Sequence, residues 1–154
     1  MPGIWMEAGR QAALVVHPDG AEAARRTREA QEMIRKGDSV LMIDAFQTGS
    51  AVAPRDRSVK HFLAFNQTDD ACRAQDILTA LAFLKQSGYG NIRLLGVGKA
   101  AAWTLFAAAV SEAPVSLETD LKGFNGSDSD FQDNFFVPGI QRAGGMKAAR
   151  ASLR

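Results

Sequence analysis

Three short apolar runs alternate along the chain with longer stretches in which apolar residues recur every three or four positions. The runs cover residues 12–17, 39–46 and 92–97. Short, largely apolar runs of this length are typical of strands buried on both faces of a parallel sheet. We predict a fourth strand over residues 115–118 and no strand before residue 11.

The stretches between these runs have the spacing of amphipathic helices. Residues 21–36 are predicted to form one helix that ends at Gly37. In the next helix, Thr68 or Asp69 can cap the N-terminus, an apolar stripe follows, and Gly88 ends it.

A third helix is expected over about residues 99–111 and is apolar nearly all round, as expected of a helix packed against the centre of a sheet. The alternation predicts one α/β domain over residues 1–154, with a three-layer parallel sheet of about four or five strands and helices on both faces. Residues 47–67 and 121–138 are predicted to be long loops, and residues 139–154 a weak helix.

Composition excludes several classes of function. The chain has 154 residues, 46% of them hydrophobic, and a formal net charge of +1, so we expect no nucleic-acid or anionic-membrane partner. With one cysteine and two histidines, neither a disulfide framework nor a Cys/His zinc site is expected. No apolar run approaches the ~20 residues that span a bilayer, and no export signal is present in this chain, so we predict a soluble protein.

The Gly-rich segment 94–101 is where an α/β protein places its chemistry, between a strand and a helix. A Walker A loop would need glycine in place of Arg93 and serine or threonine in place of Ala100, so nucleotide hydrolysis is disfavoured. The dinucleotide fingerprint G-x-G-x-x-G/A is matched by a glycine pair and an alanine, with an acidic residue about 20 positions on. These residues are Gly96, Gly98, Ala101 and Glu118.

The third motif is the nucleophile elbow G-x-S-x-G, in which a sharp strand-to-helix turn raises a serine above the sheet. Here it reads Gly96-Val97-Gly98-Lys99-Ala100. The small flanking residues are present, but glycine occupies the position of the nucleophile.

With the elbow placed there, the chain resembles the α/β-hydrolase superfamily, in its acetyl-xylan-esterase and dienelactone-hydrolase-like branch. The resemblance spans about residues 11–149 and implies a domain that lacks the opening and closing strands of the full fold. The stretches that carry it are residues 15–20, 37–44, 73–81, and 136–140 with the following Gly144-Gly145.

A working member of that superfamily needs serine, then an acid, then histidine in chain order. Both histidines, His17 and His61, precede Gly98, so no triad is completed, whichever acid follows. The acids considered are Glu118, Asp120 and Asp128. We therefore predict no catalytic residue, with Gly98 as a degenerate nucleophile position.

Several residues still fall at the expected cleft, namely His17, Asp44, Gly96, Val97, Gly98 and Lys99. For each side chain a structural role is favoured: a structural histidine at His17, a capping carboxylate at Asp44, a solvent-exposed lysine at Lys99. An exposed His61, an inert Cys72 and a core-covering phenylalanine group are also expected. That group is Phe124, Phe131, Phe135 and Phe136.

Three functional hypotheses follow. The first is a non-catalytic α/β-hydrolase-like domain with a structural or binding role and no cofactor or metal. Its partner would be a second copy, paired through sheet edges, or the remainder of a longer parent chain. The second is an active ester hydrolase with a non-standard site that uses His17 or Asp44, and the third is a dinucleotide-binding module.

Overall fold

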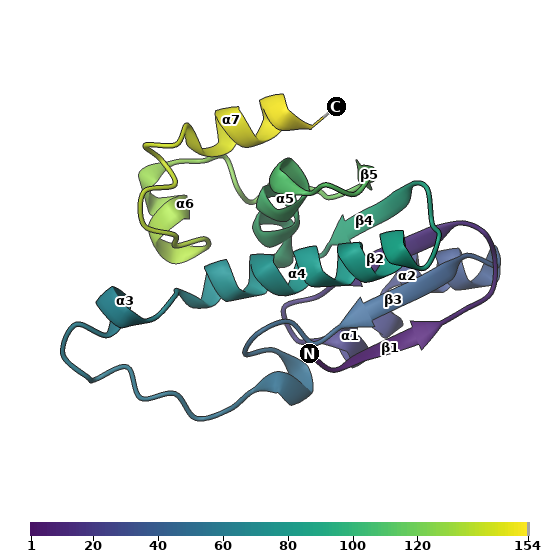
Figure 1. Cartoon of the computed structure of the whole chain (residues 1–154), viewed down its shortest axis with the longest axis horizontal. Helices are drawn as coiled ribbons and strands as arrows, with labels where there is room; N and C mark the ends of the chain where they lie inside the picture. The colour runs from purple at the N-terminus through teal and green to yellow at the C-terminus, as the bar shows by residue number, and fades with distance from the viewer. Residues whose placement is uncertain (154) are drawn as a thin grey trace.

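Five strands form one sheet in the order β1-β3-β2-β4-β5 (Figure 1). The computed structural model describes residues 1–153, apart from the side chain of Phe65. Strand β1 is antiparallel to β3, and the other neighbouring strands are parallel. The strands are β1 (Gly3–Met6), β2 (Ala12–Val16), β3 (Ser39–Ile43), β4 (Ile92–Gly96) and β5 (Val115–Leu117). The predicted α/β class and the largely parallel sheet are confirmed.

Helices cover both faces of this sheet. On one face lie α1 (Ala21–Arg26) and α2 (Arg28–Arg35), and on the other lie α4 (Asp69–Gln86) and α5 (Ala100–Val110), with α7 (Gly145–Ser152) packed on α5. The remaining short helices are η1 (Gly49–Ala51), α3 (Phe62–Phe65) and α6 (Asp128–Asp133).

Alternate side chains of the central strands enter two separate cores. In β2, Leu14 and Val16 pack with α4 and α5, whereas Ala13 and Val15 pack with α1 and α2. All five residues of β2 are buried. Burial on both faces explains why this strand reads as an uninterrupted apolar run.

Strand β1 corrects the expectation that no strand precedes residue 11. Its four residues pair with β3 in a long-range antiparallel ladder, and Pro2 O accepts a hydrogen bond from Asp44 N at 2.9 Å. Its apolar run, Ile4-Trp5-Met6, is too short to predict a strand from the pattern alone. Its pairing therefore depends on a neighbour that is distant in sequence.

The helix predicted over residues 21–36 is broken at Thr27, which is a second correction. Thr27 is extended (φ −66°, ψ 149°), and its hydroxyl donates to Ala24 O at 2.7 Å and accepts from Ala30 N at 3.3 Å. The Thr27 side chain thus ends α1 and caps α2. Threonine can do this because its hydroxyl bonds to nearby backbone groups that would otherwise join helical hydrogen bonds.

Short helices also form where loops were predicted. Helix α6 lies within residues 121–138, and a capping box of Ser127 and Asp130 starts it. The weak C-terminal helix is present as α7, which begins only at Gly145. In Figure 1 the segment between β3 and α4 extends away from the sheet and carries α3.

Candidate functional site

The carboxyl ends of β2 and β4 lie side by side at the point where the strand order reverses, since β3 is on one side of β2 and β4 on the other. Open α/β sheets bind ligands at such a switch point. His17 follows β2 and Val97 follows β4, and Val97 N donates to Val16 O at 2.9 Å. The structure thus brings these two predicted cleft residues to the same edge of the sheet.

A tight turn connects β4 to α5. Ala100 N and Ala101 N each donate at 3.1 Å, to Val97 O and Gly98 O respectively. Gly98 has a φ of +55°, in the left-handed region that favours glycine, and a Cβ built there would meet no atom within 4 Å. The apex of the turn therefore faces open space.

Position 96 requires glycine for a different reason. A Cβ built on Gly96 would lie 2.6 Å from Ala100 O and would also overlap the Thr104 hydroxyl. Strand β4 and helix α5 can approach this closely only without a side chain at Gly96. The small flank of the elbow pattern is thus required by strand-to-helix packing.

A pair of threonines, which sequence reasoning missed, holds this turn. Gly96 N donates to Thr119 Oγ1 at 2.9 Å, and Thr119 Oγ1 lies 3.0 Å from Thr104 Oγ1. Thr104 is fully buried and donates to Ala101 O at 3.0 Å. The only sequence signal was one hydroxyl residue in the otherwise apolar helix α5.

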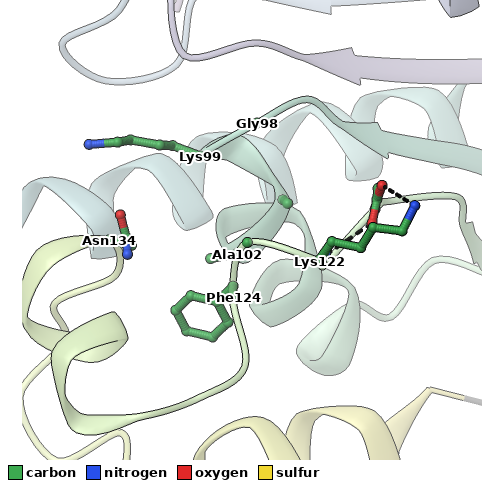
Figure 2. Close-up of a pocket in the computed structure, with 9 residues that line it drawn as sticks. Gly98, Lys99, Ala102, Lys122, Phe124 and Asn134 are labelled. Carbon is green, nitrogen blue, oxygen red and sulfur yellow. Dashed lines mark hydrogen bonds and ion pairs between the residues drawn. The ribbon is translucent and has the colours of Figure 1, made fainter.

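Beside the turn lies a cavity of about 340 Å³, within the size range of small-molecule sites (Figure 2). Lys122 Nζ lies 3.4 Å from Asp120 Oδ2 in a solvent-exposed ion pair. None of the lining residues carries a hydroxyl, thiol or imidazole group, so no serine, threonine, cysteine or histidine nucleophile faces the cavity. They are Gly98, Lys99, Ala101, Ala102, Asp120, Lys122, Gly123, Phe124 and Asn134.

His17 is engaged by its own loop. Its Nδ1 atom accepts a hydrogen bond from Asp19 N at 3.0 Å and lies 3.7 Å from Asp19 Oδ2. A neutral imidazole that accepts at Nδ1 carries its proton on Nε2, so Nδ1 is not free to take a proton from a ligand. This arrangement favours the structural role of His17.

Asp44 caps helix α1. Its Oδ1 accepts from Ala21 N at 2.6 Å, and its Oδ2 accepts from Ser50 N at 3.1 Å and from Ser50 Oγ at 2.5 Å. Gly20 and Gly49 have room for no side chain beside this carboxylate. Burial raises the pKa of Asp44, but the hydrogen bonds from Ser50 and Ala21 outweigh it and hold the pKa below its usual range.

The dinucleotide interpretation finds little support in this geometry. Glu118 accepts hydrogen bonds from Arg93 Nε at 2.7 Å and Nη2 at 2.8 Å, and these bonds lower the pKa of Glu118. Arg93 also pairs with Asp38 at 3.0 Å, so the carboxylate that would bind a ribose belongs to an ion network. The parallel strands follow a flavodoxin-like order rather than the 3-2-1-4-5-6 order of dinucleotide-binding domains.

The other candidate residues lie apart from the turn. His61 is exposed in the long segment before α4, and Cys72 is partly buried on α4 near Gln67. Phe124, Phe131 and Phe135 are buried and pack with Phe106, as predicted for residues that cover the core. Phe136, by contrast, is 43% exposed.

Two further findings concern the described residues 1–153. Nowhere among them do three or more His, Cys, Asp or Glu side chains gather in a way that could hold a metal ion. Their helices also lack the combined length and apolarity needed to cross a bilayer.

No protein-family model matches the chain, and no curated protein is similar enough in sequence to count as a relative. Functional inference therefore depends on the residues and the geometry of the turn.

Proposed function

We propose that this chain is a non-catalytic α/β-hydrolase-like domain, related to carbohydrate (acetyl xylan) esterases, with a structural or binding role. One observation carries the proposal. The strand-to-helix turn has the position, the small flanks and the left-handed apex of a nucleophile elbow, but Gly98 at the apex has no side chain.

The residues around the turn also support the proposed lack of catalysis. Nucleophilic catalysis needs a nucleophile within hydrogen-bond reach of a base that a third group orients. His17 Nδ1 already accepts from the Asp19 amide, and the Asp44 carboxylate already caps α1. Through these atoms, neither is free to act as a base on a molecule held at the turn.

A binding role has support from the cavity beside Gly98. Its volume of about 340 Å³ suits a small molecule, and its wall combines the Phe124 ring with the polar side chains of Lys99 and Asn134. Such a surface fits a small polar ligand, held without being transformed.

The proposal is tested by incubating the purified chain with p-nitrophenyl acetate and acetylated xylan, with and without a fluorophosphonate inhibitor. We expect turnover no faster than in buffer and no covalent labelling, because no hydroxyl or thiol lines the cavity. Saturable, inhibitor-sensitive turnover would refute the proposal.

A His17 variant tests the alternative that the chain is an active ester hydrolase with a non-standard site. If His17 were a base, His17→Ala would abolish any turnover that the wild-type chain shows. Equal rates in the two proteins would exclude His17 as the base and leave Asp44 as the remaining candidate of this alternative.

A further inference from the structure

The open edge of β1 carries no charged side chain or proline within the strand, although natural sheets usually protect their edges. Proteins place charged side chains, proline or bulges on exposed edge strands. Strand β1 consists of glycine, isoleucine, tryptophan and methionine, and it ends the sheet order. Both edge strands have a proline before them and a glutamate just beyond them, Pro2 and Glu7 at β1 and Pro114 and Glu118 at β5, but β5 has only three residues.

The ladder with β3 shows which backbone groups of β1 face outward. Pro2 O accepts from Asp44 N, and bonded pairs alternate with non-bonded pairs in an antiparallel ladder. Ile4, opposite Met42, therefore bonds inward to β3. The N–H and C=O groups of Gly3 and Trp5 point to the open edge.

An apolar surface continues beyond this edge onto helix α4. The Trp5 ring meets Phe83 edge-on at 6.2 Å and Tyr89 at 6.0 Å between ring centroids. Phe83 nevertheless remains 48% exposed. A chain that adds to β1 would cover apolar area as well as the unpaired backbone groups.

We propose that β1 pairs antiparallel with β1 of a second copy about a two-fold axis at Ile4, which makes one continuous sheet across the dimer. In this register Gly3 faces the partner copy's Trp5, and the two exchange backbone hydrogen bonds in both directions. The large ring meets a residue with no side chain, and isoleucine meets isoleucine. The edge is thus self-complementary in hydrogen bonding and shape, and a net charge of +1 opposes association little.

This inference concerns an edge separate from the Gly98 turn and does not depend on whether the domain is catalytic. A dimer of a catalytically active chain would refute only the proposed function. A monomer without catalytic activity would refute only the pairing.

Residue-resolved amide exchange tests the pairing, on the full chain with any purification tag at the C-terminus. If the Gly3 and Trp5 amides exchange only from the monomer, their rates fall roughly tenfold when nine in ten chains are dimeric. The Ile4 amide, bonded to β3, is the internal control for the fold. The outward amides of Val115 and Leu117 on β5 are the control for the other edge, since Glu118 N bonds inward to Leu94 O.

Cysteine cross-linking tests the register. In a Cys72→Ser background, Ile4→Cys places two thiols across a non-bonded pair with Cα atoms about 4.5 Å apart, which a disulfide can bridge. The matched control is Ser116→Cys on β5. We expect covalent dimers under mild oxidation with glutathione disulfide from Ile4→Cys alone.

Sedimentation of the unmodified chain over a concentration series measures its monomer–dimer equilibrium. A concentration-dependent dimer with Gly3 and Trp5 protected supports the proposal. A monomer at all concentrations, protection at Val115 and Leu117 instead, or cross-linking through Ser116→Cys would overturn it.

Discussion

Two positions near the sheet's carboxyl edge show how strongly one residue's role depends on its neighbours. Gly96 and Gly98 are two residues apart, yet only Gly96 is packed against helix α5, while Gly98 faces open space at positive φ. Glycine is required at the first by volume and favoured at the second by backbone conformation.

Matched alanine variants separate these two requirements. Gly98→Ala should lower the free energy of unfolding by about 1 kcal/mol, the usual cost of a left-handed L-residue. Gly96→Ala should cost roughly 3 kcal/mol, because its Cβ overlaps Ala100 O and the Thr104 hydroxyl. Urea unfolding measures both, and a larger loss for Gly98→Ala would contradict the assignment.

Asp44→Asn should lower the free energy of unfolding by about 2 kcal/mol at pH 7, because the amide nitrogen would face a backbone N–H of Ala21 or Ser50. The pKa of Asp44 is depressed, so its stabilisation is present above the ordinary aspartate pKa and is lost as pH falls through the lower folded value. The difference between variant and wild type should therefore shrink in acid. Asp133→Asn, at an exposed carboxylate, is the control and should leave the unfolding midpoint unchanged.

Local hydrogen bonds decide where the helices begin and end. Thr27 divides one predicted helix into two, whereas Thr68 caps α4 as the sequence predicts, with its side chain accepting from Ala71 N at 3.2 Å. The same residue type thus acts as a break in one place and a start in the other. Which role it takes depends on whether the preceding turn is already helical.

Thr68→Ala should cost about 1 kcal/mol of stability through the loss of this cap. Thr79→Ala, on the exposed side of the same helix, should change stability by less than about 0.5 kcal/mol. Thermal unfolding of the two variants side by side checks the prediction. Equal losses would show that the cap contributes nothing specific.

Across the whole molecule, one carboxylate at the start of α4 holds the segment that extends from the sheet. Asp69 pairs with Arg55 at 2.7 Å and also with Arg57, and Arg55 Nη2 donates to Gln67 O at 3.0 Å. The Arg55 guanidinium also lies over the Phe62 ring, 4.7 Å from its centroid. These contacts tie a stretch without regular structure to a stable helix.

Asp69→Asn should raise the rate of tryptic cleavage after Arg57 and Lys60 roughly tenfold, because charge-assisted hydrogen bonds of this kind contribute about 1.5 kcal/mol or more. Asp133→Asn, which makes the same charge change at an exposed site, is the control. Limited proteolysis followed by mass spectrometry gives the rates. Cleavage at the wild-type rate in Asp69→Asn would show that the ion pairs do not restrain the segment.

Much of the fold could be predicted because an element that is buried on two faces consists mostly of apolar residues, and these can be recognised in the sequence. The runs in β2, β3 and β4, and the apolar surface of α5, follow from it. The candidate turn was also located, since Gly-rich strand-to-helix turns are recognised by spacing. The Thr104–Thr119 pair was not, because a hydrogen bond between residues 15 positions apart leaves no periodic signal.

By itself, the sequence determined the α/β class, the order of the main elements and the presence of glycine rather than serine at position 98 of the strand-to-helix turn. Each depends on residue type and local spacing. Only the tertiary structure decided that β1 joins the sheet, that Asp44 is occupied as a cap, and that Glu118 is bound to Arg93. These depend on contacts between segments far apart in the chain, which local patterns do not encode.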